Sequence, residues 1–244
     1  MKSILITGAG SGIGCATAAA FGKAGWDLAL VGRRREALEE TAKIAGRGHV
    51  IPGDLTIAGE VERVFAEAVS RMGRLDVLFN NAGRSSRPKT IDEMPLEDWR
   101  AVLDINLSGA VMCARAAFAQ MRKQNPQGGR IINNGSISAH APRPGSTPYT
   151  VTKHAITGLT KCLSLDGRPF NIACGQIDIG NALTELAAQI AKGVPQADGR
   201  VAAEATMDVD DVAKAVLMMA ELPLSANVQF MTVMATKMPF VGRG

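Results

Sequence analysis

Short runs of apolar and β-branched residues recur along the chain, and longer segments with helical spacing of apolar positions separate them. The pattern predicts seven strands, at residues 3–7, 27–31, 49–53, 75–80, 129–136, 170–177 and 228–234. Strands that alternate with helices form right-handed βαβ crossovers, so the sheet should be parallel and covered on both faces. The sequence therefore predicts one doubly wound α/β domain of the Rossmann type, with ligands at the carboxyl ends of the strands.

Two of the predicted helices are too apolar for a helix with a single buried face. Residues 97–124 and 148–165 carry large apolar side chains around most of their circumference. A helix of this kind must be covered on a second side, and another copy of the chain is the simplest cover. We therefore expect a homodimer or homotetramer that associates through these two helices.

Composition narrows the class of protein. The 244 residues, 46% of them hydrophobic, suit a single domain over 1–244. Without a signal peptide or an apolar segment of about 18 residues, we expect a cytoplasmic protein with no membrane contact. A net charge of +4 with 4% aromatic residues argues against nucleic-acid binding. The four cysteines are expected to be buried free thiols, and His49 and His154 lack a partner at metal-binding spacing, so no metal is expected.

The loop after the first strand has an unusual concentration of glycine. Residues 7–14 read TGAGSGIG, between the strand at 3–7 and an alanine-rich helical segment at 15–25. Glycine costs roughly 0.5 to 1 kcal/mol relative to alanine, so such a cluster indicates a sharp turn or a close approach by a ligand. A glycine loop before a helix N-terminus presents unpaired amides and a positive dipole to a phosphate. A dinucleotide pyrophosphate fits this demand, although the T-G-x-x-x-G-x-G spacing also allows a plain strand-to-helix turn.

The end of the second strand indicates which dinucleotide binds. Enzymes that use NAD place an acidic residue about 20 positions after the glycines, where it accepts from the ribose hydroxyls. This chain has Gly32 there, followed by Arg33, Arg34 and Arg35. Cations at a helix start oppose the helix dipole, at some 0.3 to 1 kcal/mol each, unless an anion neutralises them. We therefore predict NADP over NAD, with Arg33 as the first contact of the 2′-phosphate and Arg34 as the second. A solvated helix start, with Glu36 as the ribose reader, is the alternative.

The chain's single tyrosine, Tyr149, lies one helical turn before Lys153. Residues at this spacing share a helix face, so the ammonium group stabilises the phenolate and prepares the tyrosine for proton transfer at neutral pH. Ser136 stands at the end of a predicted strand, on the edge of the sheet where ligands bind. A turn serine that bonds its own backbone is the alternative for Ser136.

Taken in order, these motifs resemble those of the short-chain dehydrogenase/reductase family. The glycine loop is followed by NNAG at 80–83, Asn106, Ser136 and Y-x-x-x-K at 149–153, and the resemblance covers nearly the whole chain. It implies that Tyr149 is the acid/base and that Lys153 holds the ribose hydroxyls. It also implies that Ser136 orients the substrate oxygen and that Asn106 holds a water in the proton relay. Without the resemblance, Asn106 would be interpreted as a helix-interior asparagine bonded to the backbone.

The resemblance also implies a set of cofactor contacts. The glycine loop holds the pyrophosphate, the residues after the third strand flank the adenine, and the NNAG backbone lies along the cofactor. The implied contacts are Gly8, Ser11, Gly12, Ile13, Gly14, Asp54, Leu55, Asn81, Ala82 and Gly83, together with Arg33, Arg34, Tyr149 and Lys153. After the sixth strand the family has P-G-x-x-x-T, where the nicotinamide carboxamide docks. Here Ile179 replaces the proline, and Ala182 and Thr184 are the predicted contacts.

The sequence thus predicts an NADP(H)-dependent oxidoreductase that interconverts a secondary alcohol and a ketone in a small molecule. The alternative is a nucleotide-sensing or scaffold protein on the same fold, which would be expected to lack Tyr149 or Lys153. Epimerases and dehydratases of nucleotide sugars need a longer C-terminal substrate region than we expect here.

Two further segments bear on the substrate. Residues 185–207 contain KGVPQADG, which is typical of a mobile loop, so we expect a substrate lid there. Arg84, Arg87, His140 and Arg143 lie near the expected pocket, either as contacts of an anionic substrate or as solvated loop charges.

Overall fold

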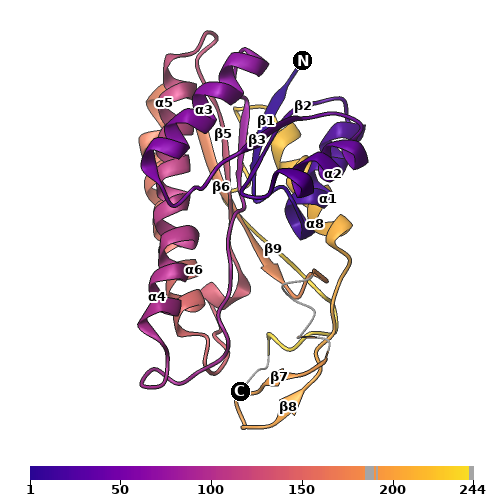
Figure 1. The fold of residues 1–244 in the computed structure, drawn as a ribbon, viewed down its shortest axis with the longest axis vertical. Coiled ribbons are helices and arrows are strands. Elements are labelled where there is room, and N and C mark those ends of the chain that lie inside the picture. The colour runs from indigo at the N-terminus through magenta and orange to yellow at the C-terminus, as the bar shows by residue number, and fades with distance from the viewer. Residues whose placement is uncertain (185–189, 191, 242–244) are drawn as a thin grey trace.

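The computed structural model describes residues 1–184, 190 and 192–241. A seven-stranded parallel sheet in the order β3-β2-β1-β4-β5-β6-β9 runs through the centre of the molecule (Figure 1). Its strands are β1 (Ser3–Thr7), β2 (Asp27–Gly32), β3 (His49–Pro52), β4 (Val77–Asn80), β5 (Gly129–Asn134), β6 (Ile172–Gly180) and β9 (Phe230–Met234). The predicted doubly wound sheet is confirmed. Because the strand order reverses between β1 and β4, the crevice that receives ligands opens between their carboxyl ends.

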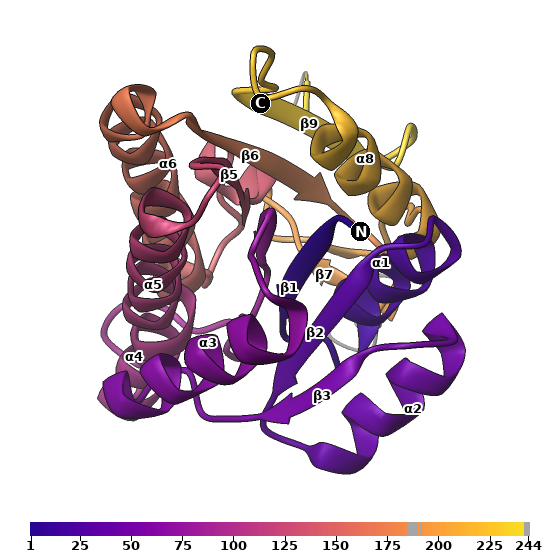
Figure 2. The ribbon, with the colours of Figure 1, turned by 90° about the horizontal axis from the view of Figure 1, so that it is seen from above.

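Helices cover both faces of the sheet (Figure 2). One face carries α1 (Gly12–Lys23), α2 (Arg35–Ala45) and α8 (Val209–Glu221), and the other carries α3 (Ala58–Met72), α4 (Leu96–Leu103), α5 (Ala110–Lys123) and α6 (Thr147–Asp166). Two apolar clusters fill the layers, one around Phe21 and Leu30 and the other around Leu5 and Leu78. Side chains that alternate along β1, such as Leu5 and Ile6, enter opposite clusters, which is why the strand is apolar at every central position.

The predicted helix at 97–124 runs from 96 to 123 and contains a π-helical turn, Asp104–Gly109. Within the described residues, Leu96–Lys123 is long and apolar enough to cross a membrane by length and composition alone, which corrects the expectation that no segment reaches that length. One side of this helix packs into the core, where Cys113, Ala117 and Met121 join the cluster against the sheet.

Strand ends differ from the predictions by up to three residues, and β6 shows a physical reason. It begins at Ile172 rather than 170 and continues past 177 to Gly180. Ile179 pairs with Val233 of β9, and Gly180 pairs with Met234. A proline at 179 would lack the backbone N–H group of this position, so its replacement by isoleucine suits a longer strand.

Part of the predicted loop at 192–199 is a strand, because β7 (Val194–Pro195) and β8 (Val201–Ala202) form an antiparallel hairpin. Gly199, with φ of 85°, allows the tight turn between them. The described residues at the two ends of the predicted lid at 185–207 lie side by side, because the backbone N–H of Leu183 donates to the carbonyl oxygen of Met207 at 2.8 Å. Residues 185–189 and 191 of the predicted lid lie outside the described residues.

The expectation of buried thiols holds for two of the cysteines only. Cys113 and Cys174 are buried, and burial raises the pKa of each to about 12, so both are neutral thiols. Cys15 is partly exposed and Cys162 is exposed, because Cys162 lies on the outer face of α6. His49 bonds Asp27 at 2.9 Å and His154 bonds the carbonyl oxygen of Thr150 at 2.9 Å.

A buried arginine ties the last helix to the sheet. Arg130 in β5 is 2% exposed, and burial lowers the pKa of its guanidinium group. Nη2 donates to carbonyl oxygens that follow α8, and Nη1 donates to the side chain of Asn227 at 2.7 Å. The carbonyls are those of Leu222, Pro223 and Ala226, at 2.9–3.2 Å. Arg130 therefore supplies the donors that the end of α8 would otherwise lack.

Replacing Arg130 with methionine tests this contact. We expect Arg130→Met to lower the free energy of unfolding by at least about 3 kcal/mol, since buried acceptors left without donors cost about 1–3 kcal/mol each. Urea unfolding followed by fluorescence measures the change. The control is Lys43→Met on α2, whose side chain is 75% exposed and which should be almost neutral. Equal stability of the two variants would contradict the assignment.

Candidate active site

The glycine loop combines two turns with one close approach. Gly8 and Gly12 have φ of 66° and 49°, in the left-handed region that favours glycine. At Gly14 an added Cβ would lie 2.2 Å from the carbonyl oxygen of Gly8, so only glycine lets α1 begin so close to the strand. Ser11, the N-cap, makes no side-chain capping bond, and the first amide groups of α1 remain available to a ligand.

A chain of hydrogen bonds aligns the ends of three strands with α6. The side chain of Asn81, after β4, donates to the carbonyl oxygen of Thr7 at 2.8 Å, and the Thr7 hydroxyl accepts from the backbone N–H groups of Asn81 and Ala82. Asn134, at the end of β5, donates from Nδ2 to Asn81 Oδ1 at 2.8 Å. Lys153 Nζ donates to the carbonyl oxygen of Asn134 at 2.7 Å. These bonds bring Lys153 to the crevice.

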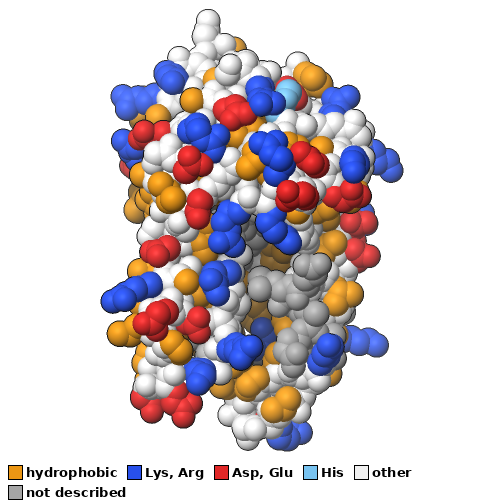
Figure 3. Space-filling view, viewed as in Figure 1, with side chains coloured by type: hydrophobic (Ala, Val, Ile, Leu, Met, Phe, Trp, Pro, Cys, Tyr) orange, Lys and Arg blue, Asp and Glu red, His pale blue; other side chains and the backbone are white. Residues whose placement is uncertain are grey.

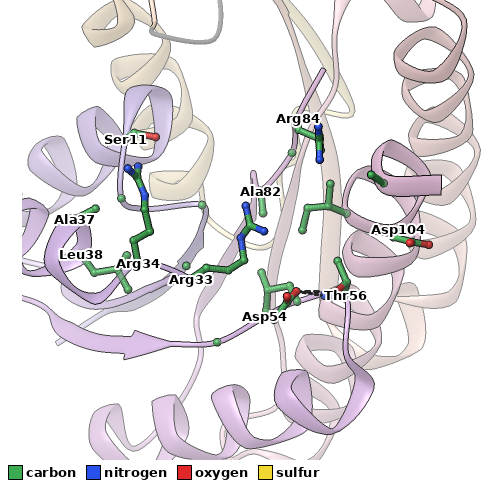
Figure 4. A pocket seen from close by; sticks show the side chains of 18 residues that line it. Ser11, Arg33, Arg34, Ala37, Leu38, Asp54, Thr56, Ala82, Arg84 and Asp104 are labelled. Atoms are coloured by element: carbon green, nitrogen blue, oxygen red, sulfur yellow. Dashed lines mark hydrogen bonds between the residues drawn. The ribbon is translucent and has the colours of Figure 1, made fainter. Parts of the chain in front are cut away.

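One end of the crevice, a cavity of about 380 Å³, receives the residues predicted for the adenosine end of the cofactor. Arg33 and Arg34 extend toward it from the segment between β2 and α2 (Figure 4). Neither side chain makes a hydrogen bond or ion pair with a described residue. Asp54 faces the same cavity, and hydrogen bonds from the backbone and hydroxyl of Thr56, with the charge of Arg33, hold the pKa of its carboxyl below the usual range. The predicted residues that line this end are Gly8, Ser11, Arg33, Arg34, Asp54, Leu55, Ala82 and Gly83.

The other end is a larger cavity of about 890 Å³, which contains the predicted chemical groups. Ser136, Tyr149 and Lys153 all line it, and Lys153 Nζ lies 5.4 Å from the centre of the Tyr149 ring. The other predicted residues at this end are Gly8, Ser11, Gly12, Ile13, Asn81, Ala82, Gly83, Ala182 and Thr184. Figure 3 shows a hollow in the surface of the molecule, with Lys and Arg side chains at its rim.

Gly14 and Asn106 are the two predicted site residues that line neither cavity. Asn106 is 3% exposed, in the π-helical turn. Its Oδ1 accepts from the backbone N–H of Arg84 at 2.8 Å, and its Nδ2 donates to the carbonyl oxygen of Arg84 and to the hydroxyl of Thr152. The side chain therefore holds the segment after NNAG against α6.

Comparison with known proteins identifies the family. Residues 2–195 match the family model described as short chain dehydrogenase. The chain belongs to the short-chain dehydrogenase/reductase family. It is 34% identical to a 3beta-hydroxysteroid dehydrogenase of Mediterraneibacter gnavus, over 77% of this chain and 74% of that protein. It is 32% identical to sulfoacetaldehyde reductase 2 of Chromohalobacter salexigens, over 96% of this chain and 94% of that protein.

A solved structure agrees with the assignment. The 3-ketoacyl-(acyl-carrier-protein) reductase from Brucella melitensis, complexed with NADH, has a TM-score of 0.85 and 26% identity, over 95% of this chain and 96% of that one. The protein is therefore an oxidoreductase of the short-chain dehydrogenase/reductase family, with the Rossmann-type fold predicted from its sequence.

In this short-chain dehydrogenase, sequence reasoning missed a carboxylate that supports Ser136. Asp178 in β6 is 1% exposed, and its Oδ1 accepts from the backbone N–H of Ser136 at 3.0 Å and from Gln176 Nε2 at 2.7 Å. Its Oδ2 lies 2.9 Å from Nε2 of His140. The Ser136 hydroxyl accepts from the backbone N–H of Ser138 at 3.1 Å, so the alternative of a turn serine describes part of its role. An aspartate inside an apolar strand was the available signal, because a buried carboxylate needs partners.

Arg84, Arg87, His140 and Arg143, the four residues considered as substrate contacts, differ in their surroundings in the structure. His140 bonds Asp178 at 2.9 Å, but its side chain is 48% exposed and lines neither cavity. Arg143 forms an ion pair with Glu204 and lines the larger cavity, so it is not a solvated loop charge. Arg84 and Arg87 are exposed and line the larger cavity. Glu204, from the segment after β8, was not among the predicted residues.

The contact between Asp178 and Ser136 requires glycine at 135. An added Cβ on Gly135 would lie 2.0 Å from Asp178 Oδ1 and 2.7 Å from Gln176 Nε2. We expect Gly135→Ala to displace the carboxylate and lower the free energy of unfolding by about 1–3 kcal/mol, as overpacking does. Urea unfolding measures this, with Gly59→Ala as the control, where nothing lies within 4 Å of the added methyl group. If Gly135→Ala unfolds at the same urea concentration as wild type, the account of this contact is wrong.

Proposed function

We propose that the protein is an NADP(H)-dependent oxidoreductase that interconverts a secondary alcohol and a ketone. The observation that carries the proposal is the convergence of Ser136, Tyr149 and Lys153 on one cavity that also receives the glycine loop. The chain's own residues fit a dinucleotide. Gly14 lets α1 begin close to the backbone of Gly8, and the first amide groups of α1 face the crevice without a side-chain cap.

In the proposed reaction the residues divide the work between proton transfer and positioning. A reduced nicotinamide, when bound, supplies the hydride to the carbonyl carbon. The Tyr149 hydroxyl gives its proton to the substrate oxygen and becomes a phenolate, and Ser136 donates a hydrogen bond to the same oxygen. Lys153 stabilises the phenolate through its positive charge. In the direction of alcohol oxidation each transfer runs in reverse.

We assign Asn106 a supporting role in this proposal. Both hydrogens of its side-chain amide are taken up by Arg84 and Thr152, so a water of the proton relay would have to donate to an oxygen of this residue. The π-helical turn that contains it is a departure from regular helix of the kind that is frequent at functional sites.

The preference for NADP rests on charge at the adenosine end. Arg33 and Arg34 face the cavity, and Gly32 has no side chain that could accept from a ribose hydroxyl. A 2′-phosphate would give the two guanidinium groups the partner that they lack among the described residues. NAD is the less favoured cofactor.

A nucleotide-sensing or scaffold protein remains the second candidate from another class. Tyr149 and Lys153 both line the cavity, and a protein without chemistry has no use for this pair. We therefore favour the enzyme.

We further propose a homodimer or homotetramer that associates through the helices at 97–124 and 148–165. Val111, Val151 and Leu165 on these helices are 39–58% exposed in the single chain, an apolar surface that association would cover. A cytoplasmic location, a small-molecule substrate, and no contact with nucleic acid or membrane stay predictions.

Replacing Tyr149 with phenylalanine removes the hydroxyl and keeps the ring. We expect Tyr149→Phe to lower kcat by at least about 100-fold, the usual contribution of a general acid or base. The measurement is absorbance of the reduced nicotinamide, with a screen of carbonyl compounds and alcohols in both cofactors to find a substrate. Cofactor affinity, measured by calorimetry, should change little and serves as the control for folding. Near-normal turnover by the variant would exclude Tyr149 as the acid/base.

Cofactor choice is tested at Gly32 and Arg33. We expect Arg33→Ala to weaken NADP about 10- to 150-fold and to leave NAD unchanged, because a hydrogen bond to a charged partner is worth about 1.5 to 3 kcal/mol. Gly32→Asp combined with Arg33→Ala should invert the preference, and Leu38 at 3.4 Å leaves room for the new Cβ. Calorimetric titration with both cofactors at one ionic strength measures this.

The control for this prediction is Arg35→Ala. Its side chain is 60% exposed, lies 3.9 Å from Glu39 and is not among the residues of the cavity. If wild type binds NAD as tightly as NADP, or if Arg33→Ala weakens both equally, the three arginines form a solvated helix start and Glu36 becomes the candidate ribose reader.

A further inference from the structure

Arg143 is held rigidly at the wall of the larger cavity. It lies in the segment between the short turn Ile137–Ala139 and α6. Its Nη2 donates to Glu204 Oε2 at 2.5 Å and to Asn181 Oδ1 at 2.7 Å, and its Nε lies 3.4 Å from Glu204 Oε1. Two other segments, those of Asn181 and Glu204, therefore fix one edge of the guanidinium group.

Glu204 neutralises this arginine. Its side chain is 2% exposed, and it also accepts from Asn181 Nδ2 at 2.8 Å and Gln196 Nε2 at 3.0 Å. Burial raises the pKa of Glu204, but the hydrogen bonds from Arg143, Asn181 and Gln196 outweigh burial, and its pKa lies below the ordinary value. The pair is therefore ionised at neutral pH and has no net charge.

The opposite edge of the guanidinium group is open. Nη1 makes no hydrogen bond to any described residue. Among described side chains, the fully shielded atoms without a partner are Thr17 Oγ1 and Arg130 Nε, so Nη1 is accessible to solvent. Arg143 lines the same cavity as Ser136 and Tyr149, and its partner Asn181 directly precedes Ala182, a predicted nicotinamide contact. The residue that carries this open donor thus lines the cavity of the proposed chemical groups.

We propose that Nη1 of Arg143 donates a hydrogen bond to a second oxygen of the substrate. The substrates would then be carbonyl compounds, or the corresponding alcohols, that carry a further hydroxyl or carbonyl group. This inference rests on the proposed function. A neutral oxygen is favoured over a carboxylate, because Glu204 already cancels the charge of Arg143 and would repel a second anion. The exposed side chains of Arg84 and Arg87 have no such fixed geometry, and a fixed donor discriminates best against a substrate that lacks its acceptor.

Matched pairs of ketones test the proposal. Each pair replaces a hydroxyl by a methyl group at a different distance from the carbonyl: hydroxyacetone with 2-butanone, 4-hydroxy-2-butanone with 2-pentanone, and 5-hydroxy-2-pentanone with 2-hexanone. We expect wild type to show a kcat/KM at least about 10-fold higher for the hydroxyketone in one or more pairs, because a site built around a hydrogen-bond donor rejects the analogue without the acceptor.

Variants connect that preference to Arg143. Because Arg143→Met leaves Glu204 buried without its cation, the principal variant is Arg143→Met combined with Glu204→Gln, which removes both charges. We expect the ratio between hydroxyketone and ketone to fall to within about 3-fold, mainly through loss of kcat/KM on the hydroxyketone. Lys89→Met is the control, since Lys89 is exposed and does not line the cavity. Its ratio should match that of wild type.

The outcomes separate the two proposals. If wild type reduces both members of every pair equally well, or if the double variant keeps the wild-type ratio, the inference about Arg143 is wrong and the proposed function stands. Acetoacetate carries a carboxylate where methyl acetoacetate carries a neutral ester. A higher kcat/KM on acetoacetate would therefore contradict the preference for a neutral second oxygen. Failure to reduce any compound with either cofactor would contradict the proposed function, and this inference with it.

Discussion

The hydrogen bond from Lys153 to the carbonyl oxygen of Asn134 is the contact on which the arrangement of the site depends. A lysine that is only 7% exposed needs acceptors for its ammonium group, because removal of a charge from water is costly. The side chain of Asn134 in turn donates to Asn81, and the side chain of Asn81 donates to the carbonyl oxygen of Thr7. The ammonium group, two asparagines and a threonine therefore keep α6 and the ends of β1, β4 and β5 in one register.

Two buried carboxylates near the site are compensated in the same way. Asp178 accepts from Ser136 and Gln176 and meets His140, while Glu204 pairs with Arg143. Removing one partner of such a group leaves an uncompensated charge in the interior, which typically costs about 3–5 kcal/mol. Both carboxylates lie beside the larger cavity. Their networks give rigidity to the segments on either side of the proposed catalytic groups, where displacement of a reacting group by about 1 Å is expensive.

Much of the fold could be predicted because each element carries its own local signal. Alternating strands and helices gave the parallel sheet, and the glycine loop gave the turn at Gly8 and the close packing at Gly14. The errors lie where local and tertiary preferences differ. The segment at 192–199 has the glycine and proline content of a loop, yet β7 and β8 pair across it. Strand β6 continues to Gly180 because β9 pairs with it there, and β9 is distant in the sequence.

By itself, the sequence determined the class of fold, the family and the residue types at the crevice, because those depend on spacing within single elements: one helical turn between Tyr149 and Lys153, and glycines at the start of α1. Only the tertiary structure decided which charges are available. Arg143 and Arg87 look alike in the sequence, but the fold brings Glu204, 61 positions away, to Arg143. Coulombic compensation depends on distance in space, and pairs that are remote along the chain leave no local pattern from which to predict them.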